Sequence, residues 1–221
     1  MIGLQLPTSG ASPLRILCLG AHCDDIEIGC GGTLLRLRAA RPDCEIRWHV
    51  LTSEPARAAE TRRSAALFGL DPADRSAVRI DAFRDGFLPW EGAAVKDAIL
   101  EARRDWSPDL IFTHAREDRH QDHRVVSDLT WNAYRDHLIL EYEIPKWDGD
   151  LGQPGFYVAL DEATVARKLE ILGSVYATQK AKAAFSLEAY RGLMALRGVE
   201  ARAASGFAEA FYARKLGLAL P

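Results

Sequence analysis

Residues 15–33 read RILCLGAHCDDIEIGCGGT, and this stretch decides the fold. Its first part, residues 15–19, is a short apolar run that is typical of a buried strand in a parallel sheet. A polar segment follows at residues 22–25, and the glycine-rich residues 29–33 are then expected to turn the chain tightly before an amphipathic helix. A strand that ends in a polar loop and leads into a helix is the first unit of an alternating α/β fold.

The rest of the chain continues this alternation of strands and helices. Further strands are predicted at residues 45–51, 78–80, 110–113, 138–144 and 156–160. Further helices are predicted at residues 55–68, 93–106, 125–134, 162–176 and 187–196. Residues 207–216 fit an edge strand or a helix equally well by periodicity. The order favours a mostly parallel sheet, and the length predicts that residues 1–221 form a single domain.

The composition excludes several classes of function. A net charge of −3 argues against a nucleic-acid partner, because such binding needs dense lysine and arginine. No apolar run approaches the ~20 residues of a membrane span, and residues 1–13 lack the features of a signal peptide. The four cysteines form no C-x-x-C pair, so neither a zinc ribbon nor a disulfide framework is indicated. We therefore expect a cytoplasmic protein with no nucleic-acid or membrane partner.

Polar residues that can bind a metal follow two of the predicted strands. His22, Asp24 and Asp25 come after the first strand, and His120 and His123 come after the fourth. Ligands of open α/β sheets bind beyond the carboxyl ends of the strands. Adjacent carboxylates repel each other, and a cation relieves that repulsion. Either segment alone is typical of a turn or a solvated loop, but together they predict a shared site of the kind that zinc prefers, with one open position.

The same segments resemble the motifs of the PIG-L/LmbE-like N-deacetylases. Residues 21–27, AHCDDIE, are similar to the signature A-H-P-D-D-x-E of that family, and residues 29–33 resemble the glycine-rich stretch that follows it. Residues 120–124, HQDHR, resemble the second motif, H-x-D-H. The chain departs from the family at Cys23, where proline is usual. Loss of that stiff residue predicts a more mobile or redox-sensitive loop with the chemistry intact.

This resemblance implies a fold and an activity. The fold would be a Rossmann-like three-layer α/β/α arrangement. The activity would be zinc-dependent hydrolysis of the N-acetyl amide of an amino sugar or glycoconjugate, which yields acetate and a free amine. The resemblance implies that His22, Asp25 and His123 hold the zinc ion, although other divalent transition metals suit such ligands. It also implies that Asp24 is the general base.

Further residues are assigned by the same resemblance. His120 would polarise the amide carbonyl or protonate the leaving amine, and Asp122 would orient His120. Arg57 and Asp85 would contact sugar hydroxyls, although a surface arginine and an Asp-Gly turn explain them as well.

Other residues are open to two interpretations. Trp147 lies in a predicted loop, where it could stack on a sugar or pack against the core, and residues 148–155 are a candidate specificity loop. His114 ends the fourth predicted strand, where it could line the pocket, although a structural histidine is the expected interpretation. Glu27 matches the family signature, but only its negative charge near a helix N-terminus suggests a role.

Two alternatives to a sugar deacetylase remain. A zinc amidase that acts on a non-sugar amide would use the same metal core. A Rossmann-type nucleotide-binding module with an incidental histidine cluster would bind no metal, although residues 29–33 lack the G-x-G-x-x-G spacing. Members of the resembling family are often multimeric, which leaves a homo-oligomer open.

Overall fold

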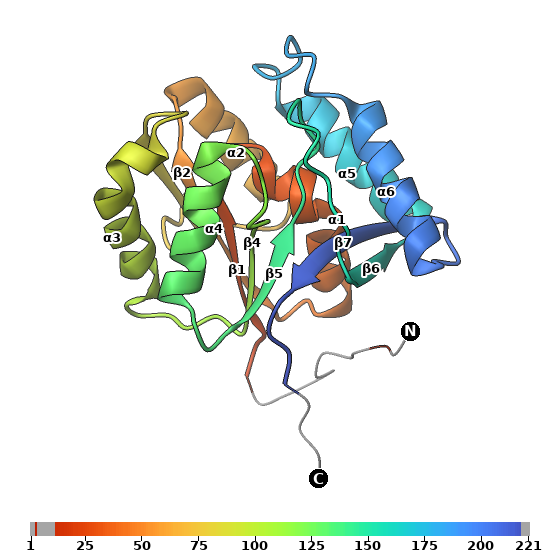
Figure 1. The fold of residues 1–221 in the computed structure, drawn as a ribbon, viewed down its shortest axis with the longest axis horizontal. Coiled ribbons are helices and arrows are strands. Elements are labelled where there is room, and N and C mark those ends of the chain that lie inside the picture. The colour runs from red at the N-terminus through yellow and green to blue at the C-terminus, as the bar shows by residue number, and fades with distance from the viewer. Residues whose placement is uncertain (1–2, 4–11, 218–221) are drawn as a thin grey trace.

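The computed structural model describes residue 3 and residues 12–217, which form a seven-stranded sheet with helices on both faces (Figure 1). The strand order is β3-β2-β1-β4-β5-β7-β6. The first five strands in that order are parallel, and β7 pairs antiparallel with both β5 and β6. The strands are β1 (Arg15–Gly20), β2 (Glu45–Thr52), β3 (Val78–Phe83), β4 (Leu110–His114), β5 (Leu138–Tyr142), β6 (Phe156–Leu160) and β7 (Phe207–Ala213).

The helices form the two outer layers. They are α1 (Asp25–Ala40), α2 (Pro55–Leu67), the short 3-10 helix η1 (Leu88–Glu91), α3 (Gly92–Arg103), α4 (Gln121–Ala133), α5 (Glu162–Val175) and α6 (Leu187–Ala201). Side chains of β1 alternate between the two cores, with Ile16 and Cys18 on the side of α1, α2 and α5, and Leu17 and Leu19 on the side of α3 and α4. The three-layer α/β fold with a mostly parallel sheet is therefore confirmed.

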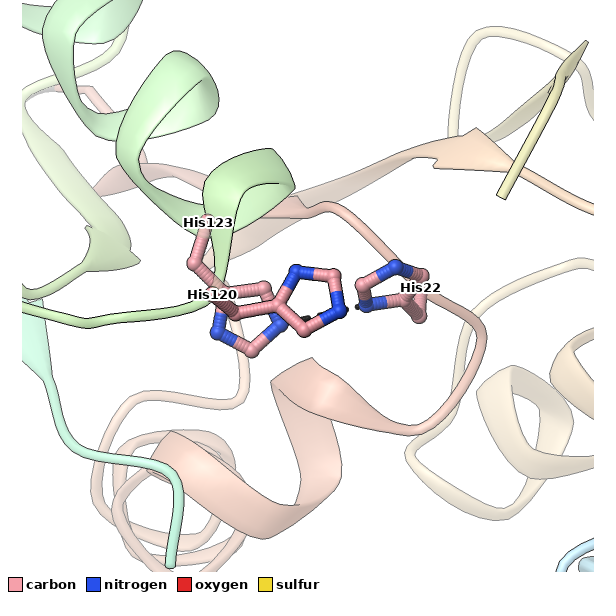
Figure 2. A group of neighbouring side chains, drawn as sticks. All are labelled: His22, His120 and His123. Carbon is pink, nitrogen blue, oxygen red and sulfur yellow. Dashed lines mark hydrogen bonds between the residues drawn. The ribbon is translucent and has the colours of Figure 1, made fainter. Parts of the chain in front are cut away.

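Helix α4 begins earlier than predicted. The sequence analysis placed its start at residue 125, whereas it starts at Gln121 with His120 as its N-cap. His123 consequently lies in the first turn of the helix, close to His22 in the loop after β1 (Figure 2).

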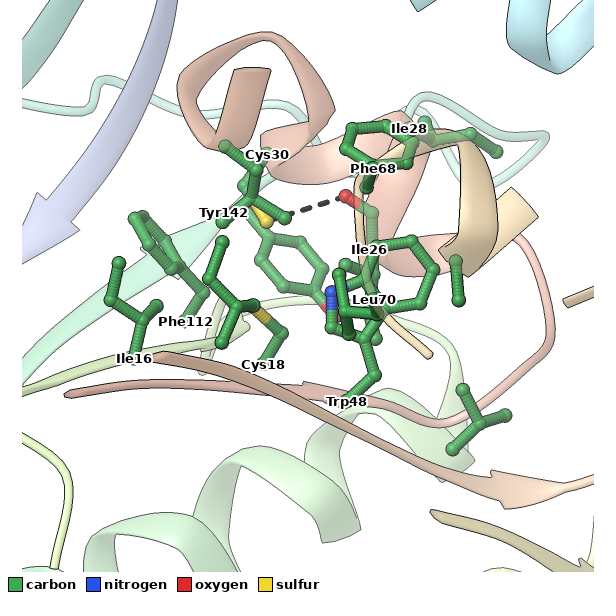
Figure 3. Packing of buried hydrophobic residues seen from close by; sticks show 14 of the residues in the cluster. Ile16, Cys18, Ile26, Ile28, Cys30, Trp48, Phe68, Leu70, Phe112 and Tyr142 are labelled. Carbon is green, nitrogen blue, oxygen red and sulfur yellow. Dashed lines mark hydrogen bonds between the residues drawn. The ribbon is translucent and has the colours of Figure 1, made fainter. Parts of the chain in front are cut away.

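The glycine run at residues 29–33 lies inside α1, so the predicted tight turn is wrong. A Cβ atom on Gly29 would lie 2.2 Å from the ring of Tyr142, which is buried under this helix (Figure 3). At Gly32 the helix approaches β7, where the carboxylate of Glu209 accepts a hydrogen bond of 2.8 Å from the Gly32 N–H. The glycines therefore allow α1 to approach the sheet closely, rather than reverse the chain.

The ambiguous segment near the C-terminus is a strand. β7 lies between β5 and β6, and the side chains of Ala208 and Phe211 are fully buried. No helix in the part of the chain that the structure describes is long and apolar enough to cross a membrane. Most of residues 1–13, which the sequence analysis tested as a signal peptide, lie outside the described residues.

Candidate active site

The two polar segments meet at one edge of the sheet. β1 and β4 are parallel neighbours, so the loop that follows β1 and the loop that follows β4 emerge side by side. The first loop carries His22, and the second leads to His120 and His123 at the start of α4. Figure 2 shows that the three imidazole rings converge.

The three residues expected to hold a metal lie within contact of one another. The Nδ1 atom of His22 is 3.1 Å from Nε2 of His123 and 3.4 Å from a carboxylate oxygen of Asp25. The other oxygen of Asp25 is 3.6 Å from His123 Nε2. All three side chains are buried. Donor atoms around a tetrahedral zinc ion lie roughly 3.3 Å apart, given Zn–N bonds of about 2.0–2.1 Å.

In His22 and His123, one ring nitrogen faces the other histidine and the second, the outer nitrogen, faces a carboxylate. Nε2 of His22 lies 3.2 Å from Asp122 and 3.1 Å from Asp85, and Nδ1 of His123 lies 2.8 Å from Asp118. A proton on each outer nitrogen leaves the two inner nitrogens as lone pairs that face each other. In that tautomer both inner nitrogens can bind a metal ion, so this donor set fits one. Without a metal, a second proton on His22 lets Nδ1 donate a hydrogen bond to His123 Nε2.

The electrostatic surroundings suit the histidines as ligands. Burial, together with the neighbouring His114, lowers the pKa of His123 to about 3, so its ring is neutral. Burial alone would lower the pKa of His22, but the charge of Asp25 and hydrogen bonds to the surrounding carboxylates raise it well above its ordinary value. A metal that binds here therefore displaces a proton from His22.

The two adjacent carboxylates have opposite pKa shifts. Burial and the charge of Asp25 raise the pKa of Asp24, although the guanidinium of Arg57, 3.5 Å away, counteracts this. Burial would also raise the pKa of Asp25, but the three imidazoles around it lower that pKa well below its usual range. Because the two pKa values are shifted in opposite directions, the two carboxyl groups can have different roles. Asp25 stays charged, and Asp24 can accept a proton.

The carboxylate of Asp122 contacts His22 rather than His120, contrary to the orienting role that the resemblance implies. One carboxylate oxygen of Asp122 faces His22 and accepts a hydrogen bond from the Gly86 N–H at 2.7 Å, and the other accepts from the Leu88 N–H at 3.1 Å. Gly86 has a φ of +83°, a conformation that favours glycine. The Asp122 carboxylate is thus committed to His22 and to the loop after β3.

His120 is oriented by its own helix instead. Its Nδ1 accepts the backbone N–H of Asp122 at 3.2 Å, which caps α4 and leaves Nε2 as the nitrogen that carries the proton. Burial and the charge of His22 lower the pKa of His120. His120 is therefore a neutral donor beside the three candidate ligands.

Arg57 and Asp85 lie at the rim of the same site. Their side chains form an ion pair of 2.9 Å, and both line a cavity of about 220 Å³ above the histidines. The walls of this cavity also include Ile28, Ile144, Trp147, Gln179, Lys182 and Tyr190. The two residues are in a position to contact a substrate, and that contact stays a prediction.

Sequence reasoning missed several members of the site. Asp118 is buried, holds His123 and pairs with Lys146 at 2.9 Å. In the sequence, only the position of Asp118 two residues before His120 pointed to a role in the site, and nothing in the sequence pointed to Lys146. His114 lies closer to the site than expected: its Nε2 is 3.1 Å from Asp25, so it contacts a candidate metal ligand. Its structural role stays a prediction.

Cys23 does not form a redox-sensitive site. Its thiol is buried and donates to the backbone oxygen of Thr52 at 3.5 Å, and burial raises its pKa to about 11. The Thr61 hydroxyl donates to the backbone oxygen of Cys23 at 3.0 Å. Because the thiolate is the reactive form, this cysteine is inert at neutral pH and packs as a small apolar residue.

Comparison with known proteins adds a family and a fold. Residues 17–134, which contain both motifs, match the model of the PIG-L family, described as GlcNAc-PI de-N-acetylase. The conserved protein TT1542 of Thermus thermophilus superposes with a TM-score of 0.72 at 23% identity, over 94% of this chain and 98% of its own. The N,N'-diacetylchitobiose deacetylase of Pyrococcus horikoshii gives 0.71 at 19% identity, over 89% and 82%.

The same fold also occurs in an enzyme of another class. The 4-carboxy-2-hydroxymuconate hydratase GalB of Pseudomonas putida superposes with a TM-score of 0.69 at 16% identity, over 94% of this chain and 99% of its own. At such identities the likeness defines the fold alone. The site must therefore decide the chemistry.

Proposed function

Because the chain belongs to the PIG-L (GlcNAc-PI de-N-acetylase) family, we propose that it is a zinc-dependent N-deacetylase of an amino sugar or glycoconjugate. The reaction is hydrolysis of the N-acetyl amide to acetate and a free amine. The observation that carries the proposal is the convergence of His22, Asp25 and His123, with pairwise donor distances of 3.1–3.6 Å and Asp24 next to them in the chain.

The donor set supports one choice of metal ligands. His22, Asp25 and His123 would hold the ion, and Asp122 and Asp118 would keep the two imidazoles in the required tautomer. A bound zinc ion supplies a water molecule of lowered pKa and a Lewis acid for the acyl oxygen.

The remaining residues move protons and stabilise charge. Asp24 accepts the proton of the attacking water and returns it to the leaving nitrogen as the C–N bond breaks, a role that its raised pKa supports. Arg57 holds the Asp24 carboxylate in place. His120, with its proton on Nε2, donates a hydrogen bond to the acyl oxygen as negative charge develops there. This neutral-donor role follows from the lowered pKa of His120 and agrees with the carbonyl-polarising role that the resemblance implies.

A substrate panel tests the proposal. Purified protein supplemented with Zn²⁺ is incubated with N-acetylated sugars, their glycosides and N-acetylated non-sugar amines, and free amine is detected. We expect amine release from at least one amino sugar, and its loss in Asp24→Asn. Release from non-sugar amides alone would favour the amidase alternative, and release from no compound would contradict the proposal. The cytoplasmic location and the homo-oligomer expected from the sequence stay predictions.

A further inference from the structure

A second cavity opens beside the catalytic cavity. It has a volume of about 310 Å³, and its walls come from the loop after β5 and from the segment that leads into α6. Figure 1 shows these two loops next to each other at one end of the molecule. Four residues line both cavities: Pro145, Lys146, Trp147 and Ala184. The two cavities therefore adjoin at these four residues, so the second cavity is the neighbour of a ligand bound at the histidines.

The walls of this second cavity are mainly apolar. We call the surface made by its apolar side chains the apolar shelf, which consists of Pro145, Trp147, Ala183, Ala184 and Ala189. The indole of Trp147 is 78% exposed, and the three alanines next to it are small. An exposed indole beside methyl groups offers a flat surface on which a planar ring can stack.

The polar groups of the same walls are already paired. The ammonium of Lys146 contacts Asp118 at 2.9 Å and Asp150 at 2.5 Å. The hydroxyl of Ser186 accepts the N–H of Ala189 at 3.2 Å as the N-cap of α6. These paired groups offer no free hydrogen-bond partner to the hydroxyl groups of a second sugar ring, whereas the indole and the methyl groups can contact an apolar ring. The shelf therefore suits an apolar group better than a saccharide.

Two further cavities border the catalytic cavity and suit an apolar group less well. One, behind Tyr190, has a volume of about 20 Å³, which is room for a single water molecule. The other has about 220 Å³, but its walls include the carboxylates of Glu117, Asp118, Glu143 and Asp150. Among the cavities in the described part of the chain, the shelf is the extension that fits an apolar substituent.

We propose that the substrate is an N-acetylated amino sugar that carries an aromatic aglycone, and that this aglycone stacks on Trp147 over the apolar shelf. This inference rests on the deacetylase function proposed above. The polar groups of the catalytic cavity, which include Arg57, Asp85 and Lys182, face the sugar.

A matched pair of substrates tests the shelf. The 4-nitrophenyl and methyl glycosides of N-acetylglucosamine share the amide and the sugar and differ in the aglycone. We expect kcat/KM to be about tenfold higher for the aryl glycoside, since aromatic stacking contributes up to about 1.5 kcal/mol. Trp147→Ala should bring the ratio of the two kcat/KM values close to one. The control is Trp90→Ala, because this indole is 74% exposed but lines neither cavity, so the ratio should persist.

The outcomes separate this inference from the proposed function. Equal kcat/KM values for the two glycosides, or an unchanged ratio in Trp147→Ala, would refute stacking of the aglycone on the apolar shelf. The proposed deacetylase function would not be affected. If neither glycoside is hydrolysed, their deacetylation is refuted, and calorimetry of the two amine products still tests the shelf. Tighter binding of 4-nitrophenyl glucosaminide than of methyl glucosaminide, lost in Trp147→Ala, supports it. Equal affinities would overturn it.

Discussion

Replacing Asp122 with asparagine is expected to weaken zinc binding about 10–100-fold, because Asp122 holds a metal ligand through its outer nitrogen. One oxygen of Asp122 faces His22 Nε2 and the Gly86 N–H, and the other faces the Leu88 N–H. Asparagine keeps a single carbonyl oxygen, so its amide group must point at one of these two sets of donors. Neither orientation reproduces the three contacts of the carboxylate.

The two amide orientations have different costs. If the NH₂ group faces Leu88, a buried backbone donor loses its partner, which costs about 1–3 kcal/mol of stability. If it faces His22, the NH₂ group opposes both the proton on Nε2 and the Gly86 N–H, which bind the same carboxylate oxygen in the wild type. In both cases His22 loses the buried carboxylate of Asp122 and keeps only the half-exposed carboxylate of Asp85, 3.1 Å from Nε2. A 10–100-fold loss of affinity corresponds to about 1.4–2.7 kcal/mol.

Competition with a fluorescent zinc chelator measures this effect, and thermal unfolding of the metal-free variant measures stability separately. His120→Ala is the control, because His120 lies outside the proposed ligand set and its loss should reduce turnover while zinc affinity persists. If Asp122→Asn binds zinc as the wild type does and loses only turnover, Asp122 acts through His120 and the reasoning from the structure is wrong.

Three further changes have definite expected outcomes. Asp24→Asn should keep its zinc but lose about 10²–10⁴-fold in kcat, measured by amine release, and near-normal turnover would exclude it as the base. Gly29→Ala should destabilise the protein by about 1–3 kcal/mol or more in thermal unfolding, since its Cβ would lie 2.2 Å from Tyr142, whereas Gly192→Ala, in open space on α6, should be neutral or stabilising. The pKa of Glu27 is raised by burial from 4.5 to about 8, so the folded protein keeps a proton that the unfolded chain loses. The contribution of Glu27 to stability should therefore fall by up to about 1.4 kcal/mol per pH unit as the pH rises between these values. Chemical denaturation of the wild type and of Glu27→Gln at several pH values should show this slope as the difference between the two proteins.

Local patterns in the sequence predicted most of the strands and helices. The apolar runs that became β1 and β6 and the helix signals around α2 and α5 act over a few residues, so they can be found without the fold. The start of α1 could not be found in this way. Glycine weakens an isolated helix, but here it permits the contact of α1 with Tyr142, which is distant in the chain.

The candidate ligands could also be predicted, but their surroundings could not. The histidines and aspartates of the two loops stand out because they follow strand ends, and the resemblance to the family singled out His22, Asp25 and His123 among them. Asp118 and Asp122 act through contacts that depend on the fold: Asp122 reaches the N–H groups of residues 86 and 88, which lie 34–36 positions earlier in the chain. A sequence motif shows which residues are present, but the partner of each carboxylate depends on how the loops are packed.

The central claim is that two distant loops bind one divalent ion through His22, Asp25 and His123. Elemental analysis of protein that has been loaded with zinc and then dialysed tests it most directly. We predict about one zinc ion per chain for the wild type and almost none for Asp25→Ala or His123→Ala, with all three proteins folded by circular dichroism. A wild type that retains no zinc, or a His123→Ala variant that retains as much as the wild type, would contradict the claim.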